Sequence, residues 1–399
     1  MKRTRILFMH QASSIGGGSY CLMNIVKALD NTKWEPMVAL KSHGQLEDEL
    51  SKMGVKVVLF PQMMGIPYNL PLTLRNFWTY CQVWCSEKAC EELLRREQID
   101  VLYLNNMMIA PYLLPAKKAG CKTVMHVREH WPLNEHKKQL EWVRRIVYEN
   151  CDKLIAINQY SASIFPEKEV TIVYDWNDMN ERYKPMPLSD IFCEDMNGKT
   201  VLLYTGGAQS IKGTDYILKS FCDGVKGDNY RLLILGISEL RPLRGWKHNV
   251  KMFLSRFGYY YYDKILYKYL SSDRRIKYIP AVYDLSHIIE QSSCFVSYFR
   301  IPHANLALVE NIILGNPCIV GDTEEAREYS GDGKYAKLVA PLNDLQAFGK
   351  ALVEFLQNLD NWRDAANRGS QMLAARFDRG RNTTILNFVL SEVVNNKTN

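Results

Sequence analysis

Two series of short apolar runs, each interleaved with longer segments of helical spacing, constrain the fold of this chain more than any other feature. The first series extends from Arg5 to Tyr174, and Tyr20–Leu29 and Cys85–Arg96 are typical of its helical segments. Strands that alternate with helices predict a parallel sheet with crossover helices. The predicted strands are Arg5–His10, Met37–Leu40, Val55–Phe60, Val101–Asn105, Thr123–Val127, Lys153–Ile157 and Val170–Tyr174.

The alternation restarts after a polar, proline-bearing stretch, Asp175–Lys199, which we interpret as an interdomain linker. We therefore expect an α/β protein with two Rossmann-like domains that face each other across a cleft. The predicted domains are residues 1–178 and 179–379, with a helix at about 380–395 that packs back on the first. The strands predicted in the second series are Val201–Thr205, Arg231–Leu235, Ile276–Ile279, Cys294–Tyr298, Pro317–Val320 and Lys337–Val339.

The composition is globular and excludes several classes of function. A length of 399 residues with 47% hydrophobic and 23% charged residues allows a sizeable core in each domain. The net charge of +7 comes from interleaved bases and acids, which suits an anionic substrate or surface better than a nucleic acid. The first apolar run, Ile6–Met9, is too short for a signal peptide, and no stretch reaches membrane-spanning length. These features predict a cytoplasmic location.

The chain has ten cysteines, and none forms a C-x-x-C pair. Cys81, Cys85 and Cys90 lie close together, but their segment contains no histidine and has helical spacing. Buried, reduced thiols are therefore a better interpretation than a metal site.

The first loop that follows a predicted strand contains Gly16, Gly17 and Gly18 before a helix. The pattern is not G-x-G-x-x-G, and no acidic residue stands at the expected distance, which argues against a dehydrogenase. Two interpretations stay open. The loop is either an anion-binding turn at a helix N-terminus or a tight turn needed only for packing.

The corresponding loop of the second series combines glycines with a cation. A strand ends at Gly206 and Gly207, and Lys212 and Gly213 precede a helix. A cation and free amides at a helix N-terminus suit a phosphate group, although the order differs from that of a P-loop. The alternative for Lys212 is a solvated surface residue.

The segment Tyr298–Asp322 is the most informative in the chain. A strand ends at Tyr298, and a helix over Leu306–Leu314 is terminated by Gly315. Glu310 lies in apolar company on this helix and needs hydrogen-bond donors, which ribose hydroxyls or an unseen basic side chain would provide. The polar residues of the preceding loop are Arg300, His303 and Asn305.

Together these segments resemble the retaining nucleotide-sugar glycosyltransferases of family 4, which have the GT-B fold. The resemblance covers nearly the whole chain, in the right order. Its motifs are the glycine loop Gly16–Gly18, Ile99–Asn106, Thr123–Pro132, Cys151–Asn158, Thr171–Asp178, the pair Lys212 and Gly213, the helix of Glu310, and Leu314–Asp322.

The resemblance implies a role for each of several residues. Lys212 would contact the diphosphate of the donor, and Glu310 would bind its ribose. The loop Pro302–Leu306 would offer backbone amides to the phosphates. The donor-binding set that follows is Gly16, Gly17, Gly18, Gly206, Gly207, Lys212, Ala304, Asn305, Leu306 and Glu310.

Two positions depart from the family pattern. The family usually has an arginine where this chain has Gly207, and a second glutamate, near the sugar, where this chain has Pro302. Arg300 and His303 are neighbours that could replace part of this chemistry, and we count His303 among the candidate catalytic residues. These departures motivate an alternative function, a catalytically inactive nucleotide-sugar-binding partner of another transferase.

Many relatives carry a histidine after the fifth strand, where this chain has Arg128. A permanent cation can clamp a phosphate, so we assign Arg128 to the diphosphate or the acceptor and group it with Lys212, Glu310 and His303 as catalytic. His126, two residues earlier in the strand, is better interpreted as a core histidine.

The departing diphosphate gains negative charge during glycosyl transfer, and a lysine and helix N-termini can stabilise that charge. No Asp-x-Asp follows a predicted strand, so we expect neither a metal nor a cofactor. By the resemblance, the sugar of a nucleotide sugar passes with retention to a glycan or lipid-linked saccharide, as in surface polysaccharide or glycolipid assembly.

Two segments mix aromatic or apolar residues with basic ones at helical spacing. His136–Tyr148 places Leu140, Val143 and Val147 beside Trp142, and Trp246–Leu270 carries many aromatic residues among lysines and arginines. Core packing beneath a solvated basic face is one explanation. Together, the two segments favour peripheral docking on an anionic membrane, at the inner face.

Overall fold

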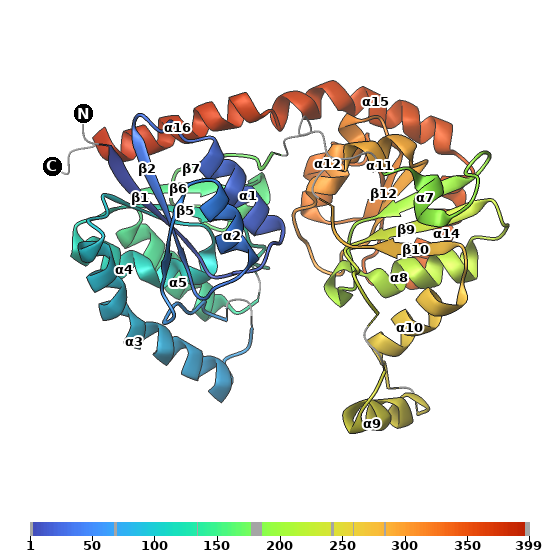
Figure 1. The fold of residues 1–399 in the computed structure, drawn as a ribbon, viewed down its shortest axis with the longest axis horizontal. Helices are drawn as coiled ribbons and strands as arrows, with labels where there is room; N and C mark the ends of the chain where they lie inside the picture. Colours follow the sequence, from blue (N-terminus) through green and yellow to red (C-terminus); the bar gives the residue numbers. More distant parts are fainter. Residues whose placement is uncertain are drawn as a thin grey trace. The chain divides into compact units, whose positions relative to one another are not determined.

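The computed structural model describes residues 3–67, 70–133, 135–176, 186–240, 243–257, 259–282 and 285–395. The chain divides into two compact units (Figure 1). Unit 1 comprises residues 1–177 together with 377–399, and unit 2 comprises residues 178–376.

Unit 1 is built on a parallel sheet of seven described strands in the order β3-β2-β1-β4-β5-β6-β7. Every strand predicted from the first series is present, with ends that move by no more than three residues. The strands are β1 (Thr4–His10), β2 (Trp34–Leu40), β3 (Lys56–Leu59), β4 (Val101–Leu104), β5 (Lys122–Val127), β6 (Lys153–Ala156) and β7 (Val170–Ile172).

Helices cover both faces of this sheet because its strands are apolar on both sides. Along β1, Leu7 and Met9 enter the core beneath α3, α4 and α5, whereas Ile6 and Phe8 enter the core beneath α1, α2 and α16. The helices of unit 1 are α1 (Gly17–Lys27), α2 (Gln45–Lys52), α3 (Leu74–Arg96), η1 (Met107–Tyr112), α4 (Leu113–Ala119), α5 (Lys137–Asn150), α6 (Gln159–Ser163) and α16 (Arg379–Asn395).

Helix α16 belongs to unit 1 although it follows unit 2 in the chain (Figure 1). Leu386, Val389, Leu390 and Val393 are buried in the core of unit 1. In addition, the side-chain oxygen of Asn382 accepts a hydrogen bond from the backbone amide of Tyr174, at 3.0 Å. Residues far apart in the sequence therefore complete one hydrophobic core.

Unit 2 contains a second parallel sheet, with six described strands in the order β10-β9-β8-β11-β12-β13. All six strands predicted from the second series are present. They are β8 (Thr200–Tyr204), β9 (Tyr230–Leu235), β10 (Ile276–Ile279), β11 (Cys294–Ser297), β12 (Cys318–Gly321) and β13 (Lys337–Val339). The two units are thus both Rossmann-like, as predicted.

The core of unit 2 lies between this sheet and the helices α8, α10 and α14, and α12 and α15 pack together on the opposite face (Figure 1). The helices of unit 2 are α7 (Leu188–Phe192), η2 (Ser210–Lys212), α8 (Thr214–Lys219), η3 (Ser220–Gly224), α9 (Trp246–Ser255), α10 (Tyr262–Ser272), α11 (Ser286–Gln291), α12 (Leu306–Ile313), α13 (Glu324–Ser330), α14 (Leu345–Leu356) and α15 (Leu359–Arg376).

Three sequence predictions need correction or completion. The predicted linker Asp175–Lys199 contains the helix α7, and its residues 177–185 lie outside the described residues. Helix α3 begins eleven residues earlier than Cys85, at Leu74. The segment Trp246–Leu270 forms two helices, α9 and α10, rather than one continuous helical stretch.

The prediction of a membrane-facing stripe on His136–Tyr148 is wrong. Leu140, Val143 and Val147 are buried in the core of unit 1, and Trp142 packs against the same core. This segment, α5, therefore uses its apolar face to cover the sheet. Among the described residues, no helix combines the length and the apolar character needed to cross a membrane.

Candidate functional site

The candidate site of unit 2 lies where the strand order reverses. Strands β8 and β11 are neighbours in the sheet, but the chain leaves β8 toward β9 on the other side. At such a switch point the two loops diverge and leave room for a ligand beyond the carboxyl ends of the strands. These loops are residues 205–213 after β8 and 298–305 after β11.

The two loops are fastened to each other by backbone contacts. The amide of Arg300 donates to the carbonyl of Ile211 at 2.9 Å. Gly213 has a φ of +68°, and a Cβ there would lie 2.0 Å from the carbonyl oxygen of Tyr298. Only glycine combines that backbone conformation with so close an approach. The position of Lys212 is therefore fixed relative to the loop that leads into α12.

The hydroxyl of Tyr204, a buried residue at the end of β8, strengthens this arrangement. It donates to the carbonyl of Lys212 at 2.8 Å and lies 2.9 Å from the hydroxyl of Thr214. Thr214 in turn donates to the carbonyl of Gly207 at 2.8 Å. Backbone groups on both sides of Lys212 are thus held by side chains of the sheet and of α8.

The side chain of Lys212 has no hydrogen-bond or ion-pair partner within the part of the chain that the structure describes. Burial lowers its pKa below the usual value for lysine, since partial removal from water disfavours the charged form. A half-buried cation without a carboxylate beside it is costly unless an anion binds there. Lys212 is therefore a candidate anion-binding group rather than a solvated surface residue.

The N-terminus of α12 offers free backbone amides in the adjacent loop. The side chain of Asn305 caps the helix by accepting from the amide of Leu308 at 3.3 Å, and its amide group donates to Ser297 at 3.1 Å. The amides of Leu306 and Ala307 have no acceptor among the described residues. Exposed amides and the helix dipole favour an anion at this position.

Other predicted residues of this segment differ in burial. Glu310, one turn further along α12, is only 4% exposed. Pro302 and Ala304 are partly exposed, and His303 is exposed, with its ring 5.5 Å from that of Phe299. The structure thus places the loop at the surface and the carboxylate of Glu310 inside the domain.

The backbone at Gly207 disfavours a side chain at this position. Gly207 has a φ of +60°, and a Cβ would approach the carbonyl oxygen of Gly236 to 2.8 Å. Any larger residue would be strained in this conformation and would have to displace the loop after β9. Gly206 is equally restricted, because a Cβ would overlap the ring of Tyr204.

Arg300 is held in an ion pair that sequence reasoning did not find. Its guanidinium contacts the carboxylate of Asp215, and the hydroxyl of Tyr260 donates to the same carboxylate. The guanidinium also lies over the ring of Tyr216, 4.7 Å from its centre. The charge of Arg300 is therefore matched inside the protein. An acid at the start of α8 resembles an ordinary helix-dipole partner, so the sequence contained no signal for this pair.

A second polar cluster lies at the corresponding edge of unit 1. Arg128, just after β5, has a side chain that is only 9% exposed, and it forms an ion pair with Asp175 at 2.7 Å. Its Nε donates to Asn105 at 3.0 Å, and the amide of Asn105 lies 3.1 Å from a ring nitrogen of His10. Burial and the charge of Arg128 lower the pKa of His10 to about 4. Asn105, Arg128 and Asp175 follow the carboxyl ends of their strands, and His10 is the last residue of β1.

Two neighbours of Arg128, His126 and Glu129, are buried. His126 has no exposed surface, and its ring lies 2.7 Å from the hydroxyl of Tyr103, which confirms the interpretation of a core histidine. Glu129 accepts hydrogen bonds from the amides of Met107 and Arg128, at 2.9 and 3.0 Å. Burial raises the pKa of Glu129 to about 7.

The loop of Gly16, Gly17 and Gly18 is exposed at the start of α1. None of these glycines has a positive φ, and a Cβ at Gly16 or Gly17 would meet nothing within 4 Å. The geometry therefore does not support the interpretation of these glycines as a tight turn needed only for packing. The open space leaves the helix N-terminus accessible.

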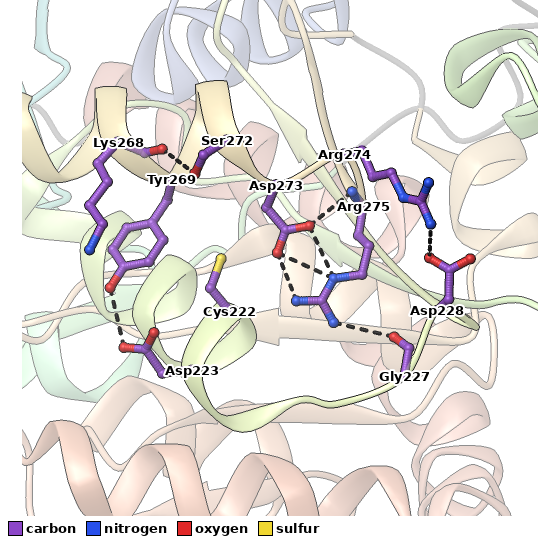
Figure 2. Close-up of a pocket in the computed structure, with 10 residues that line it drawn as sticks. All are labelled: Cys222, Asp223, Gly227, Asp228, Lys268, Tyr269, Ser272, Asp273, Arg274 and Arg275. Carbon is purple, nitrogen blue, oxygen red and sulfur yellow. Dashed lines mark hydrogen bonds and ion pairs between the residues drawn. The ribbon is translucent and has the colours of Figure 1, made fainter.

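Unit 2 has a cavity of about 640 Å³ (Figure 2), and no residue of the loops 205–213 and 298–305 lines it. Its residues precede β9 and β10, whereas ligands of parallel sheets bind beyond the carboxyl ends. Both arginines of its lining are also paired with carboxylates. Arg275 binds Asp273 at 2.7 Å, and Arg274 binds Asp228 at 3.1 Å (Figure 2). This cavity is not the candidate site.

Comparison with known families identifies both halves of the chain. Residues 16–171 match the family "Glycosyl transferase 4-like domain", and residues 199–358 match the family "Glycosyl transferases group 1". The protein is a GT-B glycosyltransferase. No curated protein sequence matches the chain significantly.

Solved structures share the fold of this glycosyltransferase at low sequence identity. HepE of Anabaena, solved with UDP and glucose, is 16% identical with a TM-score of 0.72, covering 98% of this chain and 100% of its own. The sucrose-phosphate synthase of Thermosynechococcus elongatus is 11% identical with a TM-score of 0.70, covering 98% and 99%. A protein of Listeria monocytogenes described as a putative UDP-N-acetylglucosamine 2-epimerase is 12% identical with a TM-score of 0.63, covering 100% and 98%.

Proposed function

We propose that this glycosyltransferase moves a sugar from a uridine-diphosphate sugar to a saccharide carried by a glycan or a lipid. The observation that carries the proposal is Lys212, a half-buried cation with no partner in the described structure, at the switch point of unit 2. The free amides of Leu306 and Ala307 belong to the adjacent loop. HepE was solved with UDP-glucose, which supports uridine as the base.

The diphosphate is the part of the donor that these groups suit. During transfer, the bond between the anomeric carbon and a phosphate oxygen breaks, and the diphosphate leaves with increased negative charge. Lys212 and the α12 amides stabilise that charge. The acceptor oxygen forms the new bond to the anomeric carbon, and its proton passes to the departing phosphate. Attack from the face of departure would retain the anomeric configuration.

The ribose is the proposed ligand of Glu310. The two hydroxyls of a ribose can donate to this carboxylate when the phosphates lie at the start of the same helix, α12. In this proposal the cation on the leaving group is a lysine, so the reaction proceeds without a metal ion.

Binding of the nucleotide is tested by thermal unfolding with UDP, GDP and ADP. A ligand at 100 times its dissociation constant stabilises a protein by about 2.7 kcal/mol. We expect UDP to raise the unfolding temperature of the wild type, and Lys212→Ala to remove most of the shift. Lys226→Ala, which changes an exposed lysine before β9, is the matched control. Equal shifts in Lys212→Ala and wild type would contradict the assignment.

Turnover separates transfer from the other functions that this fold supports. A transferase releases UDP and extends an acceptor, and NMR of the product gives the anomeric configuration. Stabilisation by UDP without any product would instead favour an inactive binding partner, to which Gly207 and Pro302 point. Conversion of the sugar without an acceptor would indicate an epimerase.

A lipid-linked acceptor would bring the enzyme to a membrane surface. The proposed location is therefore the cytoplasmic side of a membrane, where the protein is held peripherally. The assembly of a surface polysaccharide or a glycolipid is the process that such a reaction would serve.

A further inference from the structure

Helix α9, one of the two helices described between β9 and β10, leaves its apolar face uncovered. Crossover helices normally bury that face on the sheet, and α10 does so with Leu266 and Leu270. No residue of α9 whose side chain is described is buried. Figure 1 shows α9 beyond α10, on the side of α10 away from the sheet.

The apolar residues of α9 form a continuous stripe. Trp246, Val250, Phe253 and Leu254 recur at the spacing of one helical face, and Phe257 follows with its ring 5.2 Å from that of Phe253. Trp246 is 72% exposed and Phe257 is 74% exposed. Such a cluster is unusual on a surface that meets only water.

The opposite face of α9 is the one that is attached to the domain. His248 lies 2.6 Å from the hydroxyl of Tyr261, and Lys264 donates to the hydroxyl of Ser255 at 3.0 Å. The amino group of Lys251 lies 5.4 Å from the centre of the Tyr261 ring. These contacts orient the helix so that the stripe faces outward.

The charge around the stripe has one sign. Residues 243–257 contain four basic residues and no acidic residue. Arg244 and Arg256 flank the two ends of α9, and both are exposed. An apolar helix face bordered by basic residues, with tryptophan at its edge, is typical of helices that lie in the headgroup region of an anionic membrane.

We propose that residues 243–257, the α9 surface, dock this glycosyltransferase on an anionic lipid bilayer. A second copy of the chain suits this surface less well, because a symmetric contact through α9 would bring the basic residues of both copies together. Docking adds an attachment site to the proposed function but does not require turnover, so each can fail without the other.

The experiment is flotation of the full-length protein with vesicles of phosphatidylcholine, with or without phosphatidylglycerol. We expect the wild type to float with anionic vesicles at low salt, to remain behind with neutral vesicles, and to be released by high salt. A protein that stays in solution with anionic vesicles, or that binds both kinds equally, would overturn the proposal.

Two double variants test the two parts of the surface separately. Arg244→Glu with Arg256→Glu should weaken vesicle binding by at least about thirtyfold, because each basic residue near an anionic surface contributes about 1 kcal/mol of attraction and each glutamate adds repulsion. Trp246→Ser with Phe253→Ser should weaken it about tenfold or more, because less apolar area enters the interface. The matched controls are Lys350→Glu and Phe388→Ser, which change an exposed cation and an exposed aromatic ring elsewhere.

Two further measurements keep the outcomes distinct. Stabilisation by UDP should be unchanged in both double variants, which shows that they fold, while Lys212→Ala should float like the wild type. Measuring the molecular mass of the protein in solution tests whether a second copy of the chain covers the α9 surface. Variants that bind vesicles normally but turn a dimer into a monomer would overturn the proposal in favour of self-association.

Discussion

Arg128 in unit 1 and Lys212 in unit 2 make an instructive pair. Each cation lies beyond the carboxyl end of a parallel strand, at the edge where α/β domains bind ligands. Arg128 is bound by Asp175 and Asn105. Lys212 has no such partner in the described part of the chain. The same edge of two similar sheets therefore carries cations in opposite electrostatic situations.

The difference indicates how the work is divided between the units. A cation already neutralised by a carboxylate contributes mainly to the structure of its own domain, whereas an unmatched cation is available to an incoming anion. We therefore propose that the donor diphosphate binds to unit 2. From the sequence we predicted that Arg128 contacts the diphosphate or the acceptor. Experiments on Arg128 can show whether it has that role or a structural one.

The largest expected effect is that of Arg128→Met on stability. The substitution leaves the carboxylate of Asp175 largely buried and unpaired, which should lower the free energy of unfolding by about 3–5 kcal/mol. Urea denaturation measures it. Arg128→Met with Asp175→Leu removes both charges and should recover much of the loss. Full stability with lost activity would instead place Arg128 against a substrate.

The second prediction concerns pH and Glu129. Burial raises the pKa of Glu129 to about 7 in the folded protein, above its usual value of 4.5. The folded state therefore binds a proton more tightly between these values, so this group makes the protein less stable as pH rises from 4.5 to 7. The loss amounts to about 3 kcal/mol, since one pKa unit corresponds to 1.36 kcal/mol.

Glu129→Gln should remove that slope and stabilise the protein at pH 8 relative to pH 5, compared with wild type. His10, with a pKa lowered to about 4, acts in the opposite direction below pH 6.5 in both proteins, so only their difference is informative. Urea denaturation at the two pH values gives it. Glu135→Gln, at an exposed position, is the control. If the free energy of unfolding changed equally with pH in wild type and Glu129→Gln, the prediction would be contradicted.

Lys212→Ala should weaken donor use without weakening the fold. It removes a charge-assisted contact worth about 1.5–3 kcal/mol, which corresponds to roughly tenfold to more than a hundredfold in affinity or rate. Stability should be unchanged or higher, because a half-buried cation is lost. Donor-saturation kinetics and urea denaturation measure the two effects. Wild-type kinetics would remove Lys212 from the site.

Glu310→Ala should also weaken binding of the donor, but by losing a contact to its ribose rather than to its diphosphate. If its carboxylate binds the ribose, the variant loses roughly tenfold to a hundredfold in affinity for UDP but much less for inorganic diphosphate, which has no ribose. Competition binding with the two ligands distinguishes the groups. Equal losses for both ligands would show that Glu310 supports the loop rather than the ribose.

The smallest expected effect is that of a chelator. With a lysine and amides on the leaving diphosphate, the rate should be the same in EDTA and after addition of magnesium or manganese. Initial rates over a series of metal concentrations test this. A strict requirement for either ion would show that Lys212 does not provide the main stabilisation.

Sequence periodicity predicted every strand of both sheets, since buried parallel strands are apolar along their whole length. It also located the Lys212 loop and α12, because glycines and a cap mark the ends of these elements. It did not find the partner of Arg128, which lies 47 residues away, or that of Arg300, 85 residues away. Pairs of this kind depend on which strand ends are brought together by the fold.

The segments α5 and α9 show a second limit. Both have apolar residues at helical spacing with basic residues around them, so both predicted the same membrane-facing surface. In the fold, the stripe of α5 covers the sheet of unit 1 and that of α9 is exposed. A pattern in the sequence shows that a helix has an apolar face. The packing around the helix determines whether that face contacts the sheet or is exposed at the surface.

The return of α16 to unit 1 has a consequence for how the protein is made. Residues 1–177 leave the ribosome first, yet the core that they share with Leu386, Val389 and Leu390 stays open until residues 377–395 follow. At 5–20 residues per second, the roughly 200 intervening residues take about 10–40 s to synthesise. Unit 2 is complete in synthesis by the end of that interval, while unit 1 still exposes an apolar face to which chaperones can bind. Unit 1 is therefore the first unit whose synthesis begins and the last whose hydrophobic core is completed.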